Sequence, residues 1–89
     1  MNGRQIADEI RYWVAVSVRG YADWTIGITN DPERRSGEHQ SEGDNVRRWR
    51  QWQADSKVVA QEVEAFFKKM GMKGDLGGGN EDSVFVYIF

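Results

Sequence analysis

The 89-residue chain contains no cysteine, a single proline and no long run of apolar residues. Without cysteine it can form neither disulfides nor thiolate metal sites, which is compatible with a reducing cytosol. No segment approaches the ~20 apolar residues that a membrane-spanning helix needs, and the polar N-terminal segment is unlike a secretory signal. We therefore expect a cytoplasmic protein with no membrane partner.

An excess of positive charge is also missing. The 12 Lys and Arg residues are outnumbered by 14 Asp and Glu, and the net charge is −2. Such a protein presents no overall cationic field to nucleic acid, so any binding of that kind must come from a local patch.

Aromatic residues, in contrast, are abundant: the chain has four Trp, three Tyr and four Phe, within a composition that is 39% hydrophobic and 29% charged. This composition is typical of a soluble globular protein, and the large rings help a small core to bury enough apolar area. At this length we expect one domain, residues 1–89, with no internal repeat.

The first third of the chain predicts a short helix and a β-hairpin. Asn2 can cap an opening helix in which Ile6 and Ile10 lie one turn apart. Residues 12–18 and 24–29 are rich in β-branched and aromatic side chains and flank a turn, so they are predicted to pair as strands. Glycine in the second strand, at Gly27, indicates that backbone or ligand approaches closely there.

The middle of the chain predicts a second helix and then an ambiguous segment. Asp31 is a typical cap and Pro32 a typical first residue for a helix, which Gly37 should limit. Residues 46–55 fit a helical stripe of apolar side chains as well as a strand, and periodicity does not decide between them.

The last third predicts a long helix and a central strand. Asp55 or Ser56 should cap a helix whose apolar residues recur every three or four positions. Gly71 and Gly74 are suited to ending this helix. Residues 84–89 are apolar on both faces, as expected of a strand inside a sheet. The glycines at 77–79 lack the Lys-Ser or Lys-Thr of a phosphate-binding P-loop, so we interpret them as a flexible connection.

The segment WTIGITNDPERR, with a histidine one helical turn after its last arginine, resembles the GIY-YIG endonuclease family. The triplet Thr25-Ile26-Gly27 corresponds to the end of the family's second strand, and Arg35 to its catalytic arginine. His39 matches an active-site position of some members. Glu64, shortly before Phe67, is similar to the family's metal-binding glutamate. The resemblance extends from Tyr12 to about Gly74.

The resemblance implies an α+β fold with a small, mostly antiparallel sheet covered by helices and a strand near Trp49. It also implies phosphodiester hydrolysis with Mg²⁺ or Mn²⁺. Arg35 would hold the phosphate, His39 would transfer a proton near neutral pH, and Glu64 would bind the metal.

The tyrosines that the family carries on both strands of its hairpin are absent, since the matching positions are Val14 and Thr25. Tyr12 lies two residues before Val14, on the same face of the predicted strand, and could supply a hydroxyl. Thr25 could orient water or phosphate. The chain is therefore either a diverged nuclease or a module that keeps the scaffold without turnover.

Several of these residues have simpler explanations. Glu64 precedes Lys68 by four residues, as in an ordinary helical ion pair, and Glu62 competes with it for the ligand role. His39 and Arg35 could serve only to solvate and cap a surface helix.

The densest basic and aromatic cluster contains Arg47, Arg48 and Arg50, interleaved with Trp49 and Trp52. Together with Arg34, these arginines are the candidates for phosphate contacts. The simpler alternative buries the tryptophans and leaves the arginines on the surface.

Two functions follow. The first is a nucleic-acid-processing domain that acts as a metal-dependent endonuclease, with DNA expected in preference to RNA. The second is a catalytically inactive binding module for nucleic acid or a protein partner.

Overall fold

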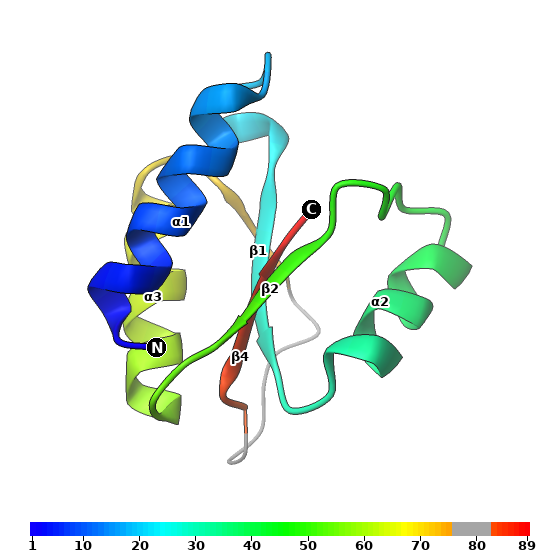
Figure 1. Ribbon diagram of the computed structural model, residues 1–89. Coiled ribbons are helices and arrows are strands. Elements are labelled where there is room, and N and C mark those ends of the chain that lie inside the picture. Colours follow the sequence, from blue (N-terminus) through cyan, green and yellow to red (C-terminus); the bar gives the residue numbers. More distant parts are fainter. Residues whose placement is uncertain (76–82) are drawn as a thin grey trace.

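A computed structural model describes residues 1–75 and 83–89, which form an α+β fold of three helices and a four-stranded mixed sheet (Figure 1). The elements are α1 (Gly3–Val16), the 3₁₀ turn η1 (Tyr21–Asp23), β1 (Thr25–Thr29), α2 (Pro32–Ser41), β2 (Arg50–Gln53), α3 (Lys57–Lys69), β3 (Lys73–Gly74) and β4 (Phe85–Ile88). The predicted glycine-rich connection at 77–79 lies outside the described residues. The described helices include none that is long and apolar enough to cross a membrane.

The strands lie in the order β2-β4-β1-β3. The C-terminal strand β4 is interior, as predicted, and pairs antiparallel with both β1 and β2. β3 is a short edge strand parallel to β1. In the pairing of β1 with β4, Gly27 lies opposite Tyr87, and this register determines which side chains meet on the faces of the sheet.

The prediction of a strand at residues 12–18 was wrong. Residues up to Val16 belong to α1, which begins with a capping box in which the side chains of Asn2 and Gln5 each accept a hydrogen bond from the other's backbone N–H. Ile6, Ile10 and Val14 recur every four residues and are all buried. This stripe outweighs the β-propensity of the later residues. The predicted hairpin is therefore not formed, and the strand antiparallel to β1 is β4.

The predicted helix starts were confirmed. The side chain of Asp31 accepts a hydrogen bond from the backbone N–H of Arg34, and Pro32 begins α2. The prediction that Gly37 limits this helix was wrong, because the helix continues to Ser41. Within the ambiguous segment 46–55, residues Arg50–Gln53 form strand β2. The Ser56 hydroxyl caps α3 by accepting from the N–H of Val59.

Helices cover both faces of the sheet: α1 and α3 pack on one, and α2 lies across the other (Figure 1). The hydrophobic core lies between the sheet and the α1/α3 pair, where Ile26 and Ile28 of β1 meet Val63 and Phe67 of α3. By strand alternation, Gly27 and Tyr87 face the other way, toward α2. The apolar face of the sheet supports the fold, while the opposite face is left for polar groups.

Candidate functional site

Polar side chains from α2 and β4 converge on the carboxylate of Asp75, on the α2 face of the sheet. Arg35 donates from Nη2 to both carboxylate oxygens, at 2.8 and 2.9 Å, and from Nε to one of them at 3.1 Å. His39 Nε2 lies 2.7 Å from Asp75 Oδ2, and the Tyr87 hydroxyl donates to the same oxygen. The Asp75 side chain is only 8% exposed. We call Arg35, His39, Tyr87 and Asp75 the Asp75 cluster.

Local structure positions each member of the cluster. Arg35 and His39 lie one helical turn apart on α2 and therefore share a face. Asp75 directly follows β3, and its backbone N–H donates to the carbonyl of Ile26 in β1. A Cβ at Gly27 would overlap the Tyr87 hydroxyl and come within 2.9 Å of the Asp75 Cβ. The close approach predicted at Gly27 is therefore made by the side chains of Tyr87 and Asp75.

Burial and hydrogen bonds to Asp75 determine the protonation states of Arg35 and Tyr87. Hydrogen bonding to Asp75 raises the pKa of Arg35 above its ordinary value, against the opposing effect of burial. Burial, together with the hydrogen bond to Asp75, raises the pKa of Tyr87. Tyr87 is therefore a neutral phenol at physiological pH, and Arg35 is a fixed cation.

A second carboxylate and an aromatic cover complete the surroundings of His39. Its Nδ1 lies 2.7 Å from an oxygen of Asp44, so the ring bridges two acids. The Trp49 ring stacks on Tyr87 with 4.4 Å between centroids, and Phe89 lies 4.5 Å from the imidazole. These rings limit the access of water to the polar groups beneath them.

Of the residues predicted from sequence, Arg35 and His39 are brought together. Thr25 lies on the same side of β1 as Gly27, two residues away, and the described residues show no hydrogen bond from its side chain to the cluster. Tyr12 does not join the cluster: its side chain is 56% exposed on α1, on the opposite side of the sheet. Tyr12 was expected to reach the site from a strand at residues 12–18, but it lies in α1 instead.

Glu64 lies within electrostatic range of the cluster. Its side chain is 17% exposed, and its carboxylate is 3.8 Å from Lys68 Nζ, in the helical pair that the sequence suggested. Burial raises the pKa of Glu64, Lys68 lowers it, and the charge of Asp75 raises it further. The competing Glu62 is exposed and lines a separate hollow between α1 and α3. Glu64 is therefore the better placed of the two acids.

A divalent cation is compatible with this acidic pair, because it would offset the mutual repulsion of Glu64 and Asp75. The set of oxygens that could bind the cation is small, however, because both Asp75 carboxylate oxygens already accept hydrogen bonds from the cluster. A second group of possible cation ligands consists of His39, Glu42 and Asp44, whose ligand atoms lie within 4.8 Å of one another. In this group, the His39 nitrogen beside Asp44 is Nδ1.

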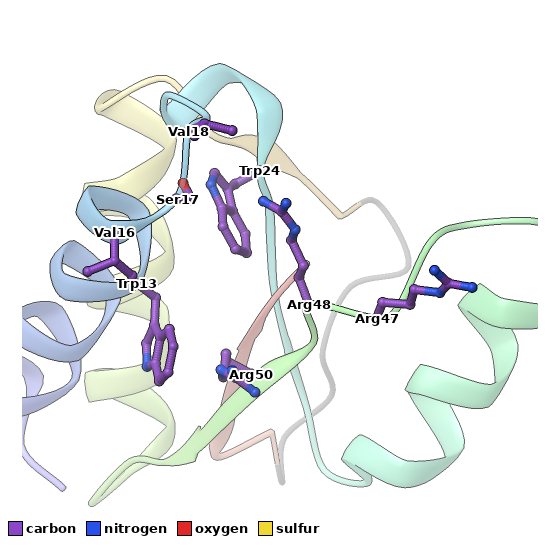
Figure 2. Close-up of a pocket in the computed structure, with 8 residues that line it drawn as sticks. All are labelled: Trp13, Val16, Ser17, Val18, Trp24, Arg47, Arg48 and Arg50. Atoms are coloured by element: carbon purple, nitrogen blue, oxygen red, sulfur yellow. The ribbon is translucent and has the colours of Figure 1, made fainter.

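The remaining basic candidates lie apart from Asp75. Arg34 is exposed on α2 and donates to the side chain of Asn30 at 3.2 Å. Arg47, Arg48 and Arg50 line a hollow near the end of α1 (Figure 2).

Sequence reasoning missed Asp75 and Tyr87. Asp75 stands in a glycine-rich stretch that matches no motif. Tyr87 had a usable signal, because residues 84–89 were predicted to be a central strand, which must border other strands on both sides. Its tyrosine was therefore a candidate neighbour for Gly27.

Comparisons with protein-family models, with curated proteins and with solved structures gave no match to this chain.

Proposed function

We propose that this protein is a nucleic-acid-processing domain and that the Asp75 cluster is its phosphodiester-cleaving site. The observation that carries this proposal is the position of Tyr87 opposite Gly27, on the strand antiparallel to β1. The GIY-YIG resemblance implies a tyrosine on each strand of a hairpin, and Tyr87 supplies one on the strand antiparallel to β1. The Tyr87 hydroxyl oxygen lies 3.4 Å from Arg35 Nε. In this proposal the C-terminal strand takes the role that the resemblance assigns to the first strand of a hairpin.

The chemistry of hydrolysis suits these groups. Cleavage of a phosphodiester develops negative charge on the phosphate oxygens, and the Arg35 guanidinium can bind two of them at once. Because Tyr87 is a phenol, its oxygen can accept a proton from the attacking water only while it passes its own proton to Asp75. His39, held between Asp44 and Asp75, would protonate the leaving oxygen. Glu64 would hold the divalent cation, which supplies charge stabilisation to the phosphate.

Substrate binding has to open the cluster. The carboxylate of Asp75 now occupies the donors of Arg35 that a phosphate would need. A phosphate group must therefore displace Asp75 from at least part of the guanidinium, and binding should be weaker than for a preformed anion site.

The test is cleavage of labelled single- and double-stranded DNA and RNA by the full chain with Mg²⁺ or Mn²⁺. We expect cleavage of at least one DNA substrate, and a loss of about 10²–10³-fold in Arg35→Ala. The control Arg4→Ala changes the same charge at an exposed position on α1. Activity that survives Arg35→Ala would overturn the assignment.

One observation favours a second candidate, an inactive binding module. The Arg35–Asp75 pair is complete and buried, as in a purely structural network. A wild-type chain that binds oligonucleotides with a steep salt dependence but never cleaves them would support this alternative.

A further inference from the structure

A hollow of about 310 Å³ lies between the C-terminal end of α1 and the segment that leads into β2 (Figure 2). We call it the arginine pocket. Its walls include Trp13, Val18, Trp24, Arg48 and Arg50. The volume is at the lower end of the range for small-molecule sites, which suits an occupant of about nucleotide size.

Trp24 carries an unsatisfied donor in the wall of this pocket. The residue is 4% exposed, and its indole Nε1 has no hydrogen-bond partner within the described part of the chain. Figure 2 shows the nitrogen edge of the ring turned toward Ser17, another wall residue. A buried N–H without an acceptor destabilises the protein, so an acceptor supplied by a ligand would stabilise this state.

Arg48 and Arg50 contribute positive charge to the pocket. Among residues 1–75 and 83–89, neither forms an ion pair, whereas Arg35 and Arg11 do. The Arg50 guanidinium lies 4.0 Å from the centre of the Trp13 ring, which orients it without neutralising it. Figure 2 shows the Arg48 guanidinium beside the Trp24 ring, at the other end of the hollow from Arg50. In a protein of net charge −2, an unneutralised guanidinium in the wall of a hollow indicates a place for an anion.

The remaining wall is apolar and open. Val18 is 97% exposed, and Val16 beside it is also exposed. A ligand that fits must therefore combine negative charge and hydrogen-bond acceptors with a flat apolar body. A nucleotide has this combination, because its phosphate is anionic and its base offers apolar faces and acceptor atoms.

We infer that the arginine pocket binds one nucleotide unit of a polynucleotide strand, with the phosphate on Arg48 and the base against Val16, Val18 and Trp13. The Trp24 N–H donates to an acceptor on the base. This inference rests on the proposed function for its choice of polynucleotide, and it gives that function a subsite outside the Asp75 cluster.

The test is titration of the full ¹⁵N-labelled chain with deoxyadenosine 5′-monophosphate, monitored by the indole N–H signals in NMR and by calorimetry. Deoxyadenosine, inorganic phosphate and a tetraglutamate peptide are titrated in parallel. We expect the nucleotide to bind about tenfold more tightly than each of them and to shift the Trp24 indole signal, which a Trp24→Phe sample identifies.

The variants separate this pocket from the Asp75 cluster. Arg48→Gln should weaken nucleotide binding about tenfold, the loss of one charged hydrogen bond, and Arg4→Gln should not change it. Tyr87→Phe should leave nucleotide affinity intact even if it abolishes cleavage. The inference is overturned if phosphate or tetraglutamate binds as tightly as the nucleotide, if Arg48→Gln behaves like Arg4→Gln, or if Tyr87→Phe weakens binding equally. Binding without cleavage would instead refute only the proposed function.

Discussion

The Asp75 cluster and the arginine pocket use arginine in opposite ways. In the Asp75 cluster, Arg35 is surrounded by acceptors, and its charge is matched by a buried carboxylate. In the arginine pocket, as far as the described residues show, neither Arg48 nor Arg50 forms an ion pair and a buried indole N–H is unpaired. The first arrangement is complete without a ligand and the second is not. The contrast teaches that a closed polar cluster contributes to stability, whereas an open one is stabilised by what binds to it.

The largest expected effect comes from removing the charge at the centre of the closed cluster. Asp75→Asn removes the buried counter-charge of Arg35, which then keeps only its pair with the more exposed Glu38, and should lower the free energy of unfolding by about 3 kcal/mol. Urea denaturation measures the loss. The control Asp8→Asn breaks an exposed pair with Arg11 and should cost less than about 1 kcal/mol. Equal losses in the two variants would show that the cluster does not stabilise the fold.

A smaller loss is expected from crowding the same cluster. Gly27→Ala places a methyl group against the Tyr87 hydroxyl and the Asp75 side chain and should destabilise the protein by about 1–3 kcal/mol. Gly37 lies within α2 with open space around it, so Gly37→Ala should stabilise the protein by about 0.5–1 kcal/mol. Thermal unfolding of both variants should therefore shift in opposite directions, and a shared direction would contradict the packing at Gly27.

The acid beside the cluster should show its raised pKa as a pH dependence. A carboxyl group whose pKa is higher in the folded state binds its proton more tightly there, so stability falls as pH rises through the window between its unfolded and folded pKa values. Glu64→Gln removes this penalty. The variant should gain stability relative to the wild type as pH rises through this window, as measured by urea denaturation at a series of pH values. A Glu64→Gln variant that loses stability relative to the wild type as pH rises would refute the raised pKa.

The smallest effect is expected in the open pocket. Arg48→Gln removes a cation that has no ion-pair partner among the described residues, so unfolding in the absence of ligand should change by less than ~0.5 kcal/mol. Arg50→Gln also loses the contact with the Trp13 ring and should cost ~0.5–1 kcal/mol. Urea denaturation compares both with Arg35→Gln. A loss in Arg48→Gln as large as that in Arg35→Gln would remove the contrast between the two regions.

Local signals in the sequence predicted much of this fold. The cap at Asp31, the cap at Ser56 and the apolar strand at 84–89 each depend on residues close together in the chain, and each was confirmed. The strand at residues 12–18 was predicted wrongly because the β-branched and aromatic residues there fit the strand pattern. The apolar face of α1, which determines the structure, begins earlier in the chain, at Ile6.

The candidate site was only partly predictable. Arg35 and His39 are neighbours on one helix, so their spacing revealed them. Asp75 and Tyr87 reach the cluster through pairings of β1 with β3 and β4, which join residues about 50 and 60 positions apart. No local pattern carries that information.

The most direct test of the account is to compare two tyrosine variants in the same DNA-cleavage assay. Tyr87→Phe removes the hydroxyl at the Asp75 cluster, and Tyr12→Phe removes an exposed hydroxyl on α1. We expect Tyr87→Phe to lower the rate by about 10²-fold or more and Tyr12→Phe to cleave at the wild-type rate. Equal rates for the two variants, or a loss confined to Tyr12→Phe, would contradict it.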